Sequence, residues 1–114
     1  MAVATPPRSR WYPYQRDFLL RFNRAGAAFP AGYVTSFYRG AGAARDSQHR
    51  FGLALDVAFP GSPSRWPVRQ LRAAMEAQGL VVVDERRGGS DHWTGPHLHV
   101  QRFPAGYLRS AGLL

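Results

Sequence analysis

Two segments of the chain place apolar residues at the spacing of an α-helix. Between residues 14 and about 28, Phe18, Leu19 and Phe22 fall on one face, and Arg16, Arg21 and Arg24 lie elsewhere. The FPAG stretch at 29–32 ends this pattern, because proline and glycine interrupt helices. The sequence therefore predicts an amphipathic helix over 14–28.

A second helix is predicted from about residue 65 to residue 78. Ser64 is expected to cap its N-terminus, and Pro67 falls in the first turn, where a missing N–H is tolerated. Gly79 follows the last helical residue and is expected to end the helix. The apolar face of this helix is predicted to consist of Trp66, Leu71, Ala74 and Met75.

The remaining periodic segments predict β-strands. They are rich in β-branched and aromatic residues, or they alternate apolar and polar positions with period two, and they cover residues 33–39, 53–59, 80–85 and 97–101. Together with the two helices, they predict an α+β fold in which helices pack on a small antiparallel sheet. We expect one domain over residues 1–114, with an irregular arm at 1–13.

The strand at 53–59 carries a carboxylate at its centre. Alternation sends Leu53, Leu55, Val57 and Phe59 to one face and Ala54, Asp56 and Ala58 to the other. Asp56 thus lies between two alanines, on a face that is clear of bulky side chains. A strand built only for core packing would more often place large apolar or solvated polar groups there.

The last strand repeats this arrangement with imidazoles. His97 and His99 project from one face, opposite Leu98 and Val100, and His49 lies in the loop before the Asp56 strand. Imidazole nitrogens and a carboxylate oxygen are ligands that zinc favours, so the pattern suggests a mononuclear zinc site. Exposed or hydrogen-bonded histidines and an aspartate paired with an arginine are the ordinary alternatives, and the pattern alone leaves both interpretations open.

Composition narrows the chemistry. The 114 residues include no cysteine, which excludes disulfides, thiolate zinc sites and thiol catalysis. The net charge is +8, and all 15 basic residues are arginines scattered along the chain, which indicates general attraction to an anionic partner and not a sequence-reading surface. No apolar run approaches the ~20 residues of a membrane span. The N-terminal stretch lacks the apolar region of a signal peptide.

Three motifs together resemble a known family. Residues 47–56 have the form S-x-H-x-x-G-x-A-x-D, residues 96–100 read PHLHV, and residues 35–39 read TSFYR. This combination resembles the zinc D-Ala-D-Ala carboxypeptidase and L-alanyl-D-glutamate peptidase family (peptidase M15-like), which includes phage endolysin domains and shares its fold with the hedgehog signalling domain. The resemblance spans residues 35–100 and implies a hedgehog/DD-peptidase fold.

The resemblance also implies an activity and a set of site residues. It implies Zn²⁺ held by His49, Asp56 and His99, and substrate contacts from Arg39 and Ser47. A guanidinium such as that of Arg39 suits a carboxylate or carbonyl of a peptide. The implied reaction is hydrolysis of a peptidoglycan stem peptide by zinc-activated water.

The chain departs from the family pattern at the general base. Many endolysins of the family carry Glu or Asp three residues before the last zinc histidine, where this chain has Pro96. Other members carry a histidine two positions before that ligand, which corresponds to His97 here. His97 is therefore the expected proton-transfer group, and Glu85 and Asp91 are further catalytic candidates.

The resemblance leaves three hypotheses for function. The first is a metallopeptidase that acts at the bacterial cell wall as a monomer. It would be either a phage-type lysin, produced in the cytoplasm or carried on a virion, or a host enzyme that remodels the wall. The second is a non-catalytic zinc-containing domain of the same fold. The third is a basic nucleic-acid-binding domain, which the dispersed charge and the absence of a nucleic-acid-binding motif disfavour. The loops at 40–48 and 86–95, which would select the cleaved bond, carry no recognisable motif.

Overall fold

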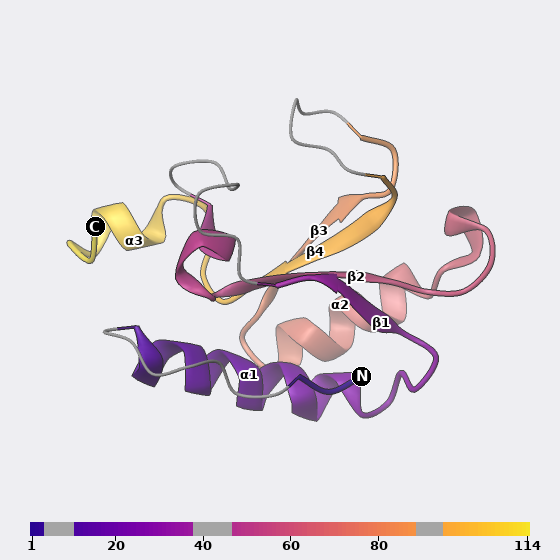
Figure 1. The fold of residues 1–114 in the computed structure, drawn as a ribbon, viewed down its shortest axis with the longest axis horizontal. Helices are drawn as coiled ribbons and strands as arrows, with labels where there is room; N and C mark the ends of the chain where they lie inside the picture. The colour runs from indigo at the N-terminus through magenta and orange to yellow at the C-terminus, as the bar shows by residue number, and fades with distance from the viewer. Residues whose placement is uncertain (4–10, 38–46, 89–94) are drawn as a thin grey trace.

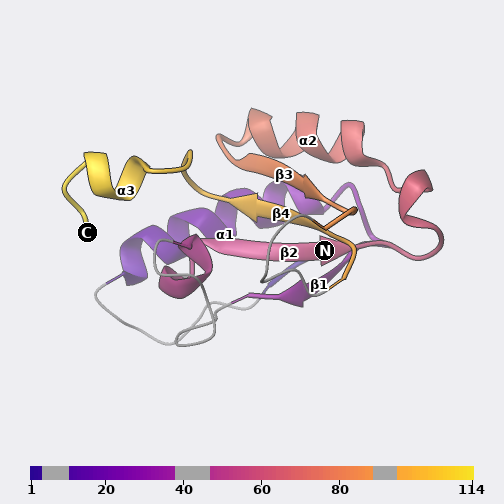
Figure 2. The same ribbon diagram turned by 90° about the horizontal axis from the view of Figure 1, so that it is seen from above.

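A four-stranded antiparallel sheet forms the centre of the computed structural model, which describes residues 1–3, 11–37, 47–88 and 95–114. Figure 1 shows helices α1 and α2 on the same side of the sheet, and Figure 2 shows the strands in the order β1-β2-β4-β3. The elements in chain order are α1 (Tyr12–Gly26), β1 (Tyr33–Ser36), the 3₁₀ turn η1 (Gln48–Phe51), β2 (Ala54–Ala58), the 3₁₀ turn η2 (Pro63–Arg65), α2 (Val68–Ala77), β3 (Val81–Glu85), β4 (His97–Gln101) and α3 (Tyr107–Ser110). The predicted α+β class is confirmed.

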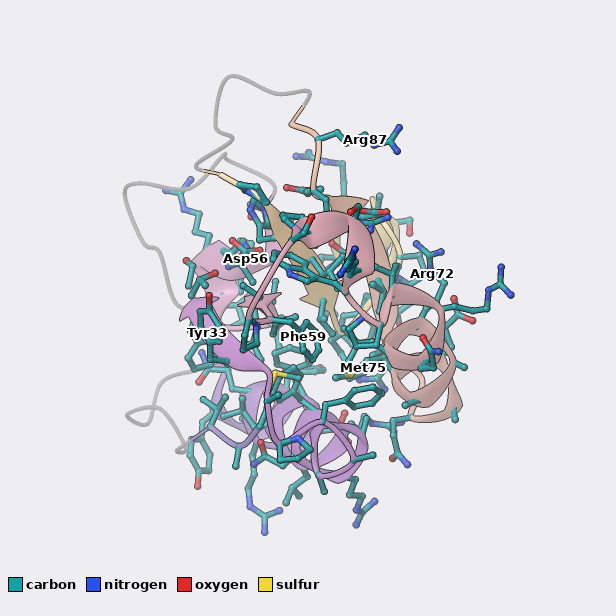
Figure 3. The ribbon with its side chains drawn as sticks, turned by 90° about the vertical axis from the view of Figure 1, so that its right-hand side faces the viewer. Tyr33, Asp56, Phe59, Arg72, Met75 and Arg87 are labelled. Carbon is teal, nitrogen blue, oxygen red and sulfur yellow. The ribbon has the colours of Figure 1, made fainter. Side chains whose placement is uncertain are left out.

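The strands expose two chemically different faces. On the face of the sheet toward the helices, the side chains of β2 and β4 are buried and apolar. They form one core with the buried side chains of α1 and α2, and this core includes Phe18, Phe22, Leu55, Val57, Leu71, Met75, Leu98 and Val100. In Figure 3, Phe59 and Met75 lie near the helices, and Asp56 lies farther from them. The alternation predicted for β2 and β4 therefore places the polar residues on the opposite face.

The strand register decides which polar residues meet. β2 pairs with β4 so that Asp56 lies directly opposite His99. β3 pairs with β4 so that Glu85 lies directly opposite His97. Because directly opposed residues have Cβ atoms only about 4.5–5.5 Å apart, both pairs are within contact distance.

The second helix begins later than the sequence predicts. Residues 63–65 form η2, and α2 starts at Val68 with Pro67 at its N-cap, so the prediction of Ser64 as the cap is wrong. The reason is Pro67, whose ring disfavours a helical backbone at the residue before it. Trp66 accordingly has an extended backbone with ψ 146°.

The segment after β4, where the sequence pattern predicts no helix or strand, contains one further helix. Tyr107–Ser110 form the short helix α3, which buries Leu108 and follows Gly106 in the left-handed region at φ 79°. The ring of Tyr107 stacks on Phe103 with centroids 4.4 Å apart. A single turn has too few residues to produce a detectable helical period, so only its tertiary contacts reveal it.

Helices in the described part of the chain are too short or too polar to cross a membrane. The arm at 1–13 is described only in part, and Trp11 at its end packs on Phe51 with ring centroids 4.9 Å apart. Trp11 thereby connects the start of α1 to η1.

Two adjacent leucines of α1 provide a test of the core. Leu19 is 3% exposed and Leu20 is 42% exposed. We expect Leu19→Ala to lower the free energy of unfolding by about 2–5 kcal/mol, because it removes buried apolar surface and leaves a cavity. Leu20→Ala, the matched control, should change it by less than about 0.5 kcal/mol. Chemical denaturation measures both, and equal losses would contradict this packing of α1.

Candidate metal centre

His49 is positioned by the turn η1 and by a backbone carbonyl. The hydroxyl of Ser47 accepts a hydrogen bond from the backbone N–H of His49, and Gly52, in the left-handed region at φ 68°, turns the chain into β2. The Nδ1 atom of His49 lies 2.8 Å from the carbonyl oxygen of Phe37. A carbonyl can only accept, so Nδ1 carries the proton, and the Nε2 atom of neutral His49 has a free lone pair.

His99 is held in the complementary tautomer by two glutamines. Its Nε2 atom lies 2.7 Å from Oε1 of Gln101, whose amide nitrogen donates to the carbonyl oxygen of Phe103 at 2.7 Å. This second bond fixes the orientation of the Gln101 amide, so Oε1 accepts from the Nε2–H of His99. Gln48 holds Phe103 in place by donating to its carbonyl at 2.6 Å and accepting from its N–H at 3.0 Å.

Three acceptor atoms therefore converge at one point. Nε2 of His49 lies 3.0 Å from Oδ1 of Asp56 and 3.1 Å from Nδ1 of His99, and the distance between the latter two atoms is 3.2 Å. With both imidazoles neutral, all three atoms direct lone pairs at one another. Such an arrangement is repulsive unless a cation lies among them. The buried group His49, Asp56 and His99 could thus hold a metal ion.

The dimensions of this triangle agree with metal coordination. In a tetrahedral site with bonds of about 2.0–2.1 Å, neighbouring ligand atoms are about 3.3–3.4 Å apart. The three distances of 3.0–3.2 Å between the ligand atoms of His49, Asp56 and His99 are only slightly shorter. A bound ion would therefore require only small side-chain movements. Each imidazole also has the second hydrogen-bond partner that metal-ligating histidines usually show.

The same cluster attracts a proton when no metal is bound. Burial by itself raises the pKa of the Asp56 carboxyl, but the hydrogen bonds that His49 and His99 make with it once a proton lies between them, together with the nearby imidazole charge, outweigh burial and hold this pKa well below its usual range. Burial lowers the pKa of His99, but hydrogen bonds with Asp56 and Gln101 outweigh it and raise this pKa above the usual value. Both shifts indicate a site that favours positive charge between these groups.

A second acid–base pair lies beside the cluster. Nδ1 of His97 lies 2.7 Å from the carbonyl oxygen of Gly95 and therefore donates to it. Nε2 of His97 lies 2.7 Å from Oε2 of Glu85 and 3.7 Å from Oδ1 of Asp56. His97 is 6% exposed. Its Nε2 atom lies between Glu85 and the residues His49, Asp56 and His99, which we call the metal group.

The structure brings together most of the residues that the sequence singles out. His49, Asp56, His99, His97 and Glu85 form one continuous cluster, with Ser47 as the cap of η1. Arg39 and Asp91 lie outside the described residues. Sequence reasoning missed Gln48 and Gln101. The only available signal for Gln101 was its position two residues after His99, on the same face of β4.

Comparison of the chain with protein-family models, with curated proteins and with solved structures gives no significant match.

Removal of one ligand should abolish metal binding. We expect excess Zn²⁺ to stabilise the metal-free protein, by about 2.7 kcal/mol when its free concentration is 100 times the dissociation constant. His49→Ala should lose most of this effect, because it removes one of three ligands. His97→Ala is the matched control and should keep it, because His97 is not a ligand. Thermal unfolding with and without Zn²⁺ measures both, and equal stabilisation of the His49→Ala protein would contradict this ligand set.

The role of Gln101 can be tested separately. Gln101→Leu removes the acceptor that fixes the His99 tautomer, and we expect it to weaken Zn²⁺ binding about 10- to 100-fold. Competition against a coloured chelator measures this affinity. Gln70→Leu, on the exposed surface of α2, is the control and should leave the affinity unchanged. Long-range ¹H–¹⁵N spectra of metal-free Gln101→Leu should also show a mixture of His99 tautomers; a single Nε2–H tautomer would contradict this role.

Proposed function

We propose that the chain is a zinc-dependent peptidase of the hedgehog/DD-peptidase fold that hydrolyses peptidoglycan stem peptides, as a D-Ala-D-Ala carboxypeptidase or an L-Ala-D-Glu endopeptidase. The observation that carries this proposal is the convergence of three acceptor atoms from His49, Asp56 and His99 directly beside the His97–Glu85 pair. The sequence motifs at 35–39, 47–56 and 96–100 support the same family. The basic charge of the chain also suits an anionic cell wall.

The donor set favours zinc. Two neutral imidazole nitrogens and one carboxylate oxygen form the ligand type that zinc prefers, and three protein ligands are typical of catalytic zinc sites, where the fourth position stays open. Zinc bound there would supply Lewis acidity, which acidifies water and polarises a carbonyl oxygen. A purely structural zinc site would more often have four protein ligands.

His97 and Glu85 provide the proton-transfer groups. The backbone carbonyl of Gly95 fixes the Nδ1 proton of His97, so protons are exchanged at Nε2. This atom lies 2.7 Å from Oε2 of Glu85 and 3.7 Å from Oδ1 of Asp56, and Glu85 orients the imidazole. The pair thus takes a proton from the attacking water and returns it to the leaving amine. In this assignment it replaces the acid that many family members carry at the position of Pro96.

A second candidate function is a non-catalytic zinc-containing domain of the same fold. The specific observation in its favour is Pro96, which has no titratable group and lies exposed where many family members carry the general base. Under this alternative, Glu85 and His97 form only a buried polar contact that helps to join β3 to β4.

Activity assays on variants separate the two candidates. We expect His97→Ala to lower kcat for stem-peptide cleavage by about 10²–10⁴-fold with its zinc content unchanged, because proton transfer is lost and the ligands remain. Glu85→Gln should lower kcat in the same direction. Glu76→Gln, on the exposed surface of α2, is the matched control and should retain full activity. Mass spectrometry of products released from purified sacculi gives the rates and identifies the cleaved bond.

One result would overturn the peptidase proposal. Wild-type protein that carries one zinc ion per chain and releases no product from sacculi or from isolated stem peptides would favour the non-catalytic candidate. Full activity of His97→Ala would keep the peptidase and reject His97 as the proton-transfer group.

A further inference from the structure

One side of the molecule carries a concentration of arginines that the metal group does not use. It is formed by η2, α2 and the end of β3, and Figure 2 shows α2 alongside β3, the edge strand of the sheet. In Figure 3, Arg72 and Arg87 lie on the side of the molecule away from Tyr33. We call this side the arginine surface, and its arginines are Arg65, Arg69, Arg72, Arg86 and Arg87.

Contacts of Arg86 join the three elements of the arginine surface. Its Nη1 atom donates to the carbonyl oxygen of Pro63 in η2 at 2.8 Å. Its Nε and Nη2 atoms donate to the two carboxylate oxygens of Asp84 at 2.8 and 2.7 Å. These bonds lower the pKa of Asp84, and the nearby charge of Arg72 on α2 lowers it further. The arginines of η2, α2 and β3 are therefore neighbours in space.

Three arginines of this surface keep an uncompensated charge. Arg65, Arg69 and Arg87 are exposed, and no ion pair or hydrogen bond joins their side chains to a described residue. Arg21 on α1 differs, because it forms an ion pair with Asp17. The free guanidinium groups of the arginine surface therefore remain available to an external anion.

The acidic residues of the same segment do not neutralise these three charges. Asp84 is bound by Arg86, and Glu85 is held on the polar face of the sheet beside the metal group. Glu76 lies near the C-terminal end of α2, about 10 Å along the helix axis from Arg69. An excess of positive charge therefore remains on this surface.

The spread of the free arginines indicates the shape of the anion. Arg65, Arg69 and Arg87 come from η2, from α2 and from the turn after β3, and all three are exposed. A small anion cannot contact three exposed side chains from three elements at once, whereas a flexible polymer with repeated charges can. A guanidinium binds phosphate with two parallel hydrogen bonds, so a chain of phosphodiesters matches this surface.

The arginine surface lacks the groups that recognise nucleic-acid bases. Proteins that bind single strands usually stack the bases on exposed aromatic side chains. Trp66 is only 8% exposed, and the aromatic residues that are clearly exposed among the described residues, Tyr14, Tyr33 and Tyr107, lie on α1, β1 and α3. The surface therefore offers contacts to phosphates and none to bases.

We propose that the arginine surface binds a phosphodiester polymer of the bacterial cell wall and holds the chain on the wall. The preference for phosphate follows from the arginines, and the choice of a cell-wall polymer rests on the proposed peptidase function. Arg86 and Arg87 directly follow Glu85, the partner of His97. A polymer bound to this surface therefore lies at the edge of the metal centre without occupying it.

Binding of poly(glycerol phosphate) to two charge-matched variants tests this proposal. The first variant combines Arg65→Gln, Arg69→Gln and Arg87→Gln. The control combines Arg16→Gln, Arg24→Gln and Arg50→Gln, which are exposed on α1 and η1. Both variants lose three positive charges. We expect the first to raise the Kd about tenfold in 0.1 M salt, because each exposed ion pair contributes only a few-fold.

The control variant should change the Kd less than about twofold, because charges more than about 10 Å from the polymer are screened in 0.1 M salt. The slope of log Kd against log salt concentration should also fall by about 2 in the first variant only, since fewer counterions are released. Fluorescence anisotropy measures both quantities. Unchanged Zn²⁺ affinity and thermal unfolding would show that both variants are folded.

Three results would overturn this proposal. Equal weakening by both variants would mean general attraction to charge and no defined surface. Absence of binding in 0.1 M salt would remove the polymer as a partner. Binding of single-stranded poly-dT about tenfold tighter than poly(glycerol phosphate), at equal phosphate concentration, would identify the partner as a nucleic acid.

Failure of this inference differs from failure of the peptidase proposal. Polymer binding that depends on Arg65, Arg69 and Arg87, without cleavage of any stem peptide, would support the arginine surface and overturn the peptidase. In an active peptidase, the first variant should keep kcat and KM on soluble stem peptides and lose rate only on walls that carry the polymer. Equal rates of both variants on such walls would keep the peptidase and overturn the arginine surface.

Discussion

The convergence of three lone pairs on one point is the constraint on which this site depends. The tautomers of His49 and His99 are fixed from outside by Phe37 and Gln101, so neither imidazole can relieve the contact by moving its proton to the inner nitrogen. Asp56 adds a negative charge at the same point. Burial makes the arrangement costly without a cation, since few waters can screen it. The fold thus builds a strong preference for a positive ion into this cluster.

The sheet keeps the apolar residues that stabilise the fold on one face and the polar cluster on the other. One face of β2 and β4 packs on α1 and α2 and supplies apolar burial, while the other face carries the polar residues. The antiparallel register then aligns Asp56 with His99 and Glu85 with His97 on adjacent rungs. A shift of one residue in either pairing would send these side chains to the core face. The same hydrophobic pattern that stabilises the sheet therefore also fixes the site.

The metal group and the His97–Glu85 pair lie next to one another on the polar side. His99 also lines a cavity of about 230 Å³ between α3, η1 and the end of β4. In the proposed peptidase, the metal group would polarise the bond and the His97–Glu85 pair would move the proton. Gln48 and Gln101 connect η1 with the end of β4 through Phe103, so the wall of the cavity and the orientation of His99 depend on one hydrogen-bond network.

The sequence by itself determined the order of the main helices and strands and the two faces of β2 and β4, and its resemblance to a known family singled out His49, Asp56 and His99 as candidate metal ligands. These follow from local periodicity and from a motif whose members are close in the chain or on one strand face. It did not determine the start of α2, where Pro67 overrides the helical pattern, or the helix α3, whose single turn has no detectable period.

Only the tertiary structure decided how distant residues pair. The contact of His97 with Glu85 depends on the register of β3 with β4, and the two hydrogen bonds between Gln48 and Phe103 join residues 55 positions apart. Glutamine and glutamate are common surface residues, so neither their type nor their spacing marks them as part of a site. The physical reason is that hydrogen bonds across a sheet depend on register and on packing against the core, and local sequence patterns do not encode either.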